Sequence, residues 1–233
     1  MKDPKIILII PAHNEEASIE KTINSIKGYD YIIVDDGSTD NTKQILINNN
    51  YNHVSLSFNL GIGGAVQTGY KYALKNGYDI AVQFDADGQH DSNSIKDLIQ
   101  PIINDEANFT IGSRFIRKNS ENFKSSFLRR VGIRLISNVI FLFSKTRIYD
   151  TTSGFRAADK EVIAHFAENY PKEYPEPVSD YELIKLGFKV TEVPAKMHER
   201  EAGKSSIHSW KSAYYVINVL LSIFVIKIRR IKK

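Results

Sequence analysis

Two acidic residues stand one position apart directly after a short apolar run in the middle of the chain. The run covers residues 80–84, and Asp85, Asp87 and Gln89 follow it. An apolar run of this length predicts a buried strand, and strand carboxyl ends face the ligand crevice in open α/β sheets. Carboxylate and amide oxygens suit Mg²⁺ or Mn²⁺ that also holds substrate phosphates. We therefore expect a metal site here, although Asp and Gly are also ordinary turn residues.

Acidic residues also follow two other predicted strands. Glu15 comes after the apolar run 5–10, and Asp36 comes after the run 31–34. The carboxyl ends of parallel strands meet at one edge of a sheet, so we expect these groups to converge with Asp85. A carboxylate such as Asp36 can accept a hydrogen bond from a nucleotide's base or ribose. The chain has no G-x-G-x-x-G after its first strand and no P-loop, so nucleotide binding should depend on acids and metal.

Apolar strands alternate with amphipathic helices along most of the chain, which predicts an α/β fold with a doubly wound, mostly parallel sheet. The Pro-rich segment 170–177 is expected to be loop or edge. We expect strands at 5–10, 31–34, 54–58, 80–84, 109–111 and 189–193, and helices at 17–26, after 41, at 61–75, 94–100, 127–145, from 159, and at 180–186 and 213–226.

The charge distribution is uneven. The chain has 233 residues, no cysteine and a net charge of +4. Nine Lys or Arg and one acid lie between residues 114 and 147, and five Lys or Arg lie between 227 and 233. Such clusters are typical of surfaces that bind phosphates, either of nucleic acid or of a membrane. Few aromatic residues lie between the arginines, which argues against nucleic acid.

Two predicted helices, 127–145 and 213–226, combine an apolar face with basic neighbours. Each is either a core helix with a solvated charged face or a helix lying on a membrane surface. The second segment, 213–226, is apolar apart from Asn218 and Ser222, and its fourteen residues are too few to span a bilayer. The apolar run near the amino terminus is too short for a secretory signal, so we expect a cytoplasmic protein.

Seven segments, taken together and in this order, resemble the inverting GT-A glycosyltransferases of family 2, in particular the polyprenyl- and dolichyl-phosphate sugar synthases. The resemblance implies a GT-A catalytic domain over residues 1–207 and a basic amphipathic, membrane-associating helix over 208–233. The segments are IPAHNEE (10–16), VDDGSTDNT (34–42), NLGIGGAVQTGYKYA (59–73), FDADGQH (84–90), GSRF (112–115), DTTSGFR (150–156) and HEREAGKSSI (198–207).

The resemblance assigns roles to individual positions. The nucleotide-sugar would contact Pro11, Ala12, His13, Glu15, Val34, Asp36, Gly64, Asp85 and Ala86. The metal, Mg²⁺ or Mn²⁺, would be held by Asp85, Asp87 and Gln89. The acceptor phosphate would be held by Arg114, Arg130, Arg134, Arg200, Lys204 and Ser205. The catalytic residues would be Asp87, Arg200, Arg114 and Asp180.

The implied reaction moves a sugar from a nucleotide diphosphate, UDP in preference to GDP, to a polyprenyl phosphate at the cytoplasmic membrane face, for cell-envelope polysaccharide. The alternative acceptor is a sugar hydroxyl, which requires a base, Asp180 or Glu176. A non-catalytic nucleotide-sugar binding module is a third interpretation, and the intact Asp85–Asp87 pair argues against it. Expected partners are the donor, the lipid acceptor, a membrane surface, and a second copy of the chain or a small membrane protein.

Overall fold

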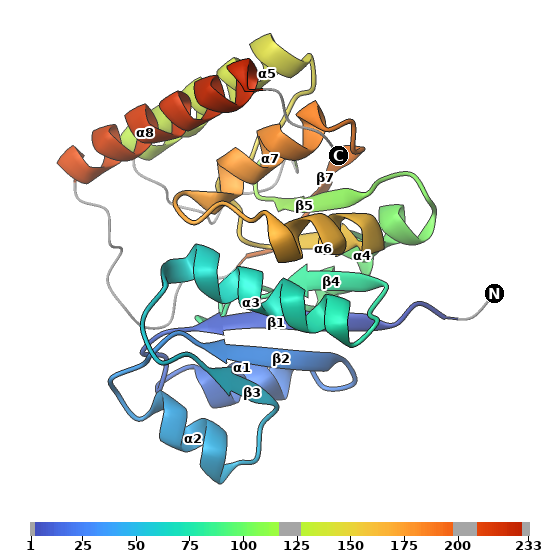
Figure 1. The fold of residues 1–233 in the computed structure, drawn as a ribbon, viewed down its shortest axis with the longest axis vertical. Helices are drawn as coiled ribbons and strands as arrows, with labels where there is room; N and C mark the ends of the chain where they lie inside the picture. Colours follow the sequence, from blue (N-terminus) through green and yellow to red (C-terminus); the bar gives the residue numbers. More distant parts are fainter. Residues whose placement is uncertain (1–2, 117–126, 198–208, 230–233) are drawn as a thin grey trace.

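A seven-stranded sheet forms the centre of the computed structural model, which describes residues 3–116, 127–197 and 209–229 (Figure 1). The strand order is β3-β2-β1-β4-β6-β5-β7. Strand β6 runs antiparallel to its neighbours β4 and β5, and the other strand pairs are parallel. The mostly parallel sheet predicted from the sequence is confirmed.

The elements follow one another with short connections through most of the chain. In order they are β1 (Ile6–Ala12), α1 (Ile19–Ser25), β2 (Asp30–Asp35), α2 (Thr42–Asn48), β3 (His53–Ser55), α3 (Gly61–Lys75), β4 (Ile80–Gln83), a 3₁₀ turn (Ser92–Ser94), α4 (Ile95–Ile103), β5 (Phe109–Ser113), α5 (Phe127–Ser144), β6 (Arg156–Asp159), α6 (Lys160–Glu168), α7 (Pro175–Lys185), β7 (Val190–Pro194) and α8 (Ser209–Ile228).

Helices cover both faces of the sheet because strand side chains alternate between them. In β1, Ile7 and Ile9 enter the core formed with α3 and α6, whereas Leu8 and Ile10 enter the core formed with α1 and α4. Helices α5, α7 and α8 extend the first of these cores. A strand buried on both faces explains the continuous apolar run in this part of the sequence.

The chain order reverses beside β1. Strands β2 and β3 are added on one side of β1, and β4 is added on the other side. Loops that leave two neighbouring strands in opposite directions open a crevice at their carboxyl ends. In this protein the crevice lies between the ends of β1 and β4.

Two parts of the predicted secondary structure are wrong. Strand β6 has only four residues, Arg-Ala-Ala-Asp, and was not predicted, because alanine carries little strand signal. Helix α7 begins at Pro175, inside the segment expected to be loop, whereas we expected a helix from Asp180. Proline is tolerated in the first helical turn, where the backbone N–H groups have no helical partner in any case.

Helices α5 and α8 pack side by side and run parallel to each other (Figure 1). A Cβ atom at Gly132 of α5 would meet Val216 of α8, and Lys227 of α8 lies over the ring of Phe143 of α5. Both pairs are 84 positions apart, as a parallel arrangement requires. Within the described residues, no helix is both long and apolar enough to cross a membrane.

Candidate functional site

A cleft of about 420 Å³ opens at the crevice between β1 and β4. Most of its lining comes from residues that the sequence predicted to bind the nucleotide-sugar or the metal. The lining consists of Pro11, Ala12, His13, Glu15, Asp36, Ile62, Ala65, Gln83, Asp85, Ala86, Asp87 and Glu176. The strand ends therefore converge at one cleft, as the sequence analysis expected.

The lining is strongly acidic. Five of its residues are carboxylic acids, and no Lys or Arg is among the described residues that form it. A diphosphate could not enter such a cleft without a cation, because the like charges would repel each other. The charge of the cleft thus points to a ligand that arrives together with a metal ion.

Asp85 and Asp87 are the two carboxylates suited to that ion. Within the described residues, no three His, Asp or Glu side chains cluster closely enough to hold a metal by themselves. Mg²⁺ is commonly bound by one or two carboxylates together with substrate phosphates, so this pair fits a metal shared with a diphosphate. The backbone N–H of Gln89 donates to Asp87 Oδ1 (3.0 Å), and Gln89 does not line the cleft. Its role as a ligand stays a prediction.

His90 fixes the backbone of Asp85, a function that the sequence analysis did not assign. The Asp85 N–H donates to His90 Nδ1 (3.0 Å), so that nitrogen carries no proton. Burial lowers the pKa of His90, and the ring packs against Phe84 and Phe155. A neutral imidazole is therefore the form that can hold Asp85. The FDADGQH segment was the signal for this residue.

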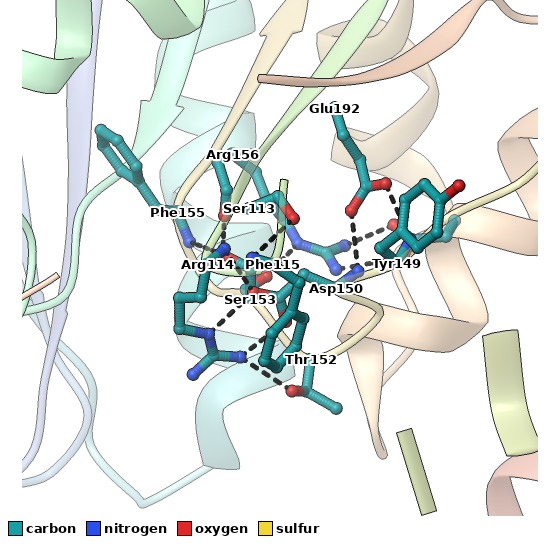
Figure 2. Close-up of polar contacts among 12 residues, drawn as sticks. Ser113, Arg114, Phe115, Tyr149, Asp150, Thr152, Ser153, Phe155, Arg156 and Glu192 are labelled. Atoms are coloured by element: carbon teal, nitrogen blue, oxygen red, sulfur yellow. Dashed lines mark hydrogen bonds and ion pairs between the residues drawn. The ribbon is translucent and has the colours of Figure 1, made fainter. Parts of the chain in front are cut away.

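The segment 150–156 packs against Asp85, one of the two carboxylates predicted to hold the metal. A Cβ atom at Gly154 would lie 2.7 Å from Asp85 Oδ2, so a larger residue at this position would have to displace that carboxylate. Asp150 is fully buried and accepts two bonds from the guanidinium of Arg114, at 2.7 Å from Nε and 2.6 Å from Nη2 (Figure 2). Glu192 accepts the backbone N–H of Asp150 at 2.7 Å. This network joins the end of β5 to the floor of the cleft.

Arg114 was predicted to contact the acceptor phosphate. The structure places it 8% exposed, in an ion pair with Asp150 and bonded to Thr152 Oγ1 (3.0 Å). Its charge is thus largely balanced within the protein. Contact with a phosphate stays a prediction for this residue, and the network in Figure 2 gives it a structural role as well.

Arg156 connects the same floor to helix α7. Its Nη1 donates to the carbonyl of Glu176 (2.9 Å) and lies 2.9 Å from Asp180 Oδ1. Its Nε donates to the carbonyl of Ser153 (2.5 Å). One buried guanidinium therefore fixes the start of α7 relative to the segment beneath Asp85.

Glu176 and Asp180, the two candidate bases, occupy different environments. Glu176 lines the cleft, whereas Asp180 is fully buried against Arg156 and is not part of the lining. Burial raises the pKa of Glu176, and the charge of Asp85 raises it further, while Arg156 lowers it. If the reaction uses a base from α7, Glu176 is the residue that the geometry favours.

His13 and Asp36, which also line the cleft, are held in place by hydrogen bonds. His13 Nδ1 lies 3.0 Å from the carbonyl oxygen of Asp36 and donates to it. Asp36 Oδ1 accepts the backbone N–H of Leu60 (2.7 Å), which directly precedes α3. These bonds tie the ends of β1 and β2 to the first turn of α3, which contributes Ile62 and Ala65 to the lining.

The remaining predicted residues lie elsewhere. Val34 is buried in the core, and Gly64 packs against Leu60 beside the cleft. Arg130 and Arg134 lie exposed on α5. Arg200, Lys204 and Ser205 fall outside the described residues. The sequence analysis gave no role to Gln83, Ile62 or Ala65, which line the cleft.

Comparison with known proteins gives a family match over most of the chain. The family model for Glycosyl transferase family 2 matches residues 7–166. The UDP-N-acetylglucosamine–dolichyl-phosphate N-acetylglucosaminyltransferase of Methanococcus voltae is 39% identical over 219 residues, covering 84% of this chain and 86% of the relative. The polyprenol monophosphomannose synthase of Mycolicibacterium smegmatis is 28% identical, covering 87% of this chain and 81% of the relative.

A solved structure shows the same fold. Glucosyl-3-phosphoglycerate synthase from Mycobacterium tuberculosis, in complex with Mn²⁺, UDP-glucose and phosphoglyceric acid, superposes with a TM-score of 0.71. The sequences are 19% identical, and the match covers 95% of this chain and 80% of the synthase. The GT-A fold predicted from the sequence is confirmed.

Proposed function

Because the chain belongs to glycosyl transferase family 2, we propose that it transfers a sugar from a UDP-sugar to a polyprenyl phosphate. The observation that carries the proposal is the acidic cleft at the reversal of chain order, with Asp85 and Asp87 at its floor. A nucleoside diphosphate bound through a divalent cation fits its charge. Of the two named relatives, one is a dolichyl-phosphate N-acetylglucosaminyltransferase and the other is a polyprenol monophosphomannose synthase.

In this proposal, Asp85 and Asp87 hold Mg²⁺ or Mn²⁺, and His13 and Asp36 contact the base and ribose. When bound, the metal ion neutralises the diphosphate leaving group. His90 and Gly154 keep Asp85 in position for that role. Glu176 faces the cleft from α7 and borders the space that the acceptor would enter.

A lipid phosphate needs no general base. Its second pKa is about 6, so near neutral pH it is already nucleophilic and attacks the anomeric carbon with inversion. Cations that hold it would be enough, and we propose Arg200, Lys204, Ser205, Arg114, Arg130 and Arg134 for this role.

A sugar hydroxyl is the second candidate acceptor. It is favoured by Glu176, a carboxylate that lines the cleft and whose pKa is raised by burial, which makes it a stronger base than an ordinary carboxylate. A hydroxyl acceptor would make Glu176, rather than Asp180, the base.

We also propose that α5 and α8 hold the enzyme on the inner face of the cell membrane, where both substrates would meet. Neither helix contains an acidic residue. Among the side chains of α8 that the structure describes, the apolar ones more than half exposed are Tyr214, Ile217, Leu221, Phe224, Val225 and Ile228. They recur every three or four residues and so form one stripe, next to Lys227 and Arg229. An apolar stripe with basic neighbours fits an anionic lipid surface.

The test is transfer from a panel of UDP- and GDP-sugars to undecaprenyl phosphate, with Mg²⁺, with Mn²⁺ and with excess chelator. We expect lipid-linked product from a UDP-sugar that disappears in chelator and returns on adding metal. Asp87→Asn should be inactive while its circular dichroism spectrum and Tm stay close to wild type. Full turnover in chelator would refute the metal-dependent mechanism.

A further inference from the structure

Gln83 is a buried amide on the floor of the cleft, at the last position of β4. Its side chain is 1% exposed and lines the cleft. Among the described residues, its carbonyl oxygen Oε1 has no hydrogen-bond partner. Buried polar atoms are nearly always paired, so an unpaired acceptor in a ligand cleft points to a donor on the ligand.

The orientation of this amide is set by its neighbour. Gln83 Nε2 donates to Asp85 Oδ1 at 3.3 Å. Rotating the amide by half a turn would place Oε1 against a carboxylate, which is repulsive. The absence of a side chain at Gly154 leaves room for this pair, because a Cβ there would lie 3.2 Å from Nε2. Oε1 is therefore the atom that faces away from the metal pair.

Gln83 lies between the metal side and the acceptor side of the cleft. Along β4, Ala81 belongs to the core shared with α3, and alternation places Gln83 on the same face. The β4–β6 register sets Gln83 opposite Arg156, which donates to the carbonyl of Glu176. In an inverting displacement the leaving group and the nucleophile occupy opposite faces of the anomeric carbon. In the proposed reaction, a residue between Asp85 and Glu176 would therefore face the transferred sugar.

We propose that Gln83 is a binding residue for the transferred sugar, with Oε1 accepting a hydrogen bond from a hydroxyl or an amide N–H of that sugar. The inference rests on the proposed function and adds a determinant of donor specificity to it. A sugar with a donor group at that position satisfies Oε1, and a deoxygenated sugar leaves it unpaired.

The experiment compares Gln83→Met with wild type. Methionine keeps the length of the side chain and removes both polar atoms. Gln100→Met on α4 is the matched control, because Gln100 is exposed and bonds to Asn104. For each protein we would measure UDP affinity with Mn²⁺, kcat/KM for the sugar donor that wild type uses, and Tm without ligand.

We expect Gln83→Met to bind UDP within about twofold of wild type and to lose about five- to fiftyfold in kcat/KM for the donor. The Tm without ligand should change little, because the substitution removes an unpaired buried acceptor together with one 3.3 Å hydrogen bond to Asp85, whose carboxylate is partly exposed to water. The extra rise in Tm given by the UDP-sugar over UDP should shrink. Gln100→Met should match wild type throughout.

Two results would overturn the inference. If Gln83→Met loses as much affinity for UDP as it loses in kcat/KM for the UDP-sugar, Gln83 acts on the metal and nucleotide and not on the sugar. If its donor kinetics equal those of Gln100→Met, Gln83 does not contact the donor. If Gln83→Met lowers the Tm, the same measurements can be made on Gln83→Asn. Asparagine keeps the amide group, but its shorter side chain moves that group away from the cleft. Wild-type protein that binds neither UDP nor GDP with Mn²⁺ would refute the proposed function itself, and the inference with it.

Discussion

Asp150 shows how one buried carboxylate organises the floor of the site. It is fully buried and accepts bonds from the backbone N–H and the guanidinium of Arg114. Burying two charges is costly, and a buried pair is retained when hydrogen bonds satisfy both partners. Its partner Arg114 and the segment leading to Gly154 thereby become fixed relative to Asp85.

Asp150→Asn should therefore destabilise the protein strongly. The substitution leaves the charge of Arg114 buried without compensation, and breaking such a pair costs about 3–5 kcal/mol. Urea denaturation followed by circular dichroism measures the loss. Asp97→Asn, an exposed acid on α4, is the control and should change the free energy of unfolding by no more than about 1 kcal/mol. A loss below that limit for Asp150→Asn would mean that the pair contributes little.

Glu176→Gln separates the two acceptors. With a lipid phosphate acceptor the substitution should cost little, because no proton has to be removed. With a hydroxyl acceptor it should reduce kcat by about 10²–10⁴-fold. Arg200→Ala should have the opposite dependence on the acceptor. If Arg200 holds the acceptor phosphate, the substitution should reduce kcat/KM by about ten- to hundredfold.

The pH dependence of kcat tests independently whether Glu176 is the base. Burial raises its pKa, so its basic form is lost as the pH falls through a value above that of an ordinary carboxyl group. If Glu176 is the base, kcat falls with pH through that raised pKa in wild type, and Glu176→Gln loses this limb. An acid limb that is identical in both proteins would exclude Glu176 as the base. It would leave two titrating groups, the acceptor phosphate and Asp180, whose pKa burial raises to about 7.

Helix α7 is held from two sides, which sets the position of Glu176 in its first turn. Arg156 fixes it from the sheet. From the other side, Tyr174, the residue that precedes α7, packs edge-to-face on Tyr215 of α8, with ring centroids 4.9 Å apart. Tyr174 has φ 50° and ψ 49°, a left-handed conformation that is unfavourable for a bulky residue, particularly before proline. Contact with α8 thus helps to keep this strained turn in place.

Tyr215→Ala should reduce activity by releasing that turn. Loss of the ring pair removes about 0.5–1.5 kcal/mol beyond simple burial, and relaxation of Tyr174 would move Glu176 and the acceptor side of the cleft. We expect a lower kcat with UDP affinity retained, measured by steady-state kinetics and titration. Tyr215→Phe keeps the ring and should restore wild-type kcat. Equal kcat for the Ala and Phe variants would show that the contact between Tyr174 and α8 does not affect the site.

Acidic and basic side chains lie on different parts of the molecule. The cleft at the ends of β1 and β4 is acidic, whereas α5 and α8 lie together beyond α7 and carry basic and apolar side chains (Figure 1). Lys185 of α7 donates to the carbonyls of Lys227 and Arg229 (both 2.7 Å), so the end of α8 is attached to the body of the protein. A surface bound through α8 would therefore hold the cleft at a fixed orientation.

Phe224→Glu should weaken binding to vesicles that contain anionic lipid by about tenfold or more, because it removes apolar burial and adds a repelled charge. Cosedimentation measures the binding, which should also weaken as salt rises. Ile47→Glu on α2 is the matched control, since Ile47 is similarly exposed, at 50% against 52% for Phe224. Equal binding by both variants would mean that the α8 stripe does not meet the membrane.

The sequence by itself determined the local elements and the edge at which the site forms. Helix α3 runs from Gly61 to Lys75 as its pattern predicted, and Asp36, Asp85 and Glu15 converge as strand ends must. Hydrophobic periodicity and the geometry of parallel sheets act over a few residues or through a general rule, so they can be read without a structure.

Only the tertiary structure decided which side chains face the cleft and which support it. Glu176 and Asp180 are one turn apart, and the buried Arg156, from a strand that the sequence did not reveal, covers the second and leaves the first in the cleft. Helix α8 is apolar on nearly all sides, so its pattern could not show that Val219 and Ile223 enter the core while Phe224 stays exposed. These outcomes depend on contacts between residues far apart in the chain, and such contacts leave no periodic signal in the sequence.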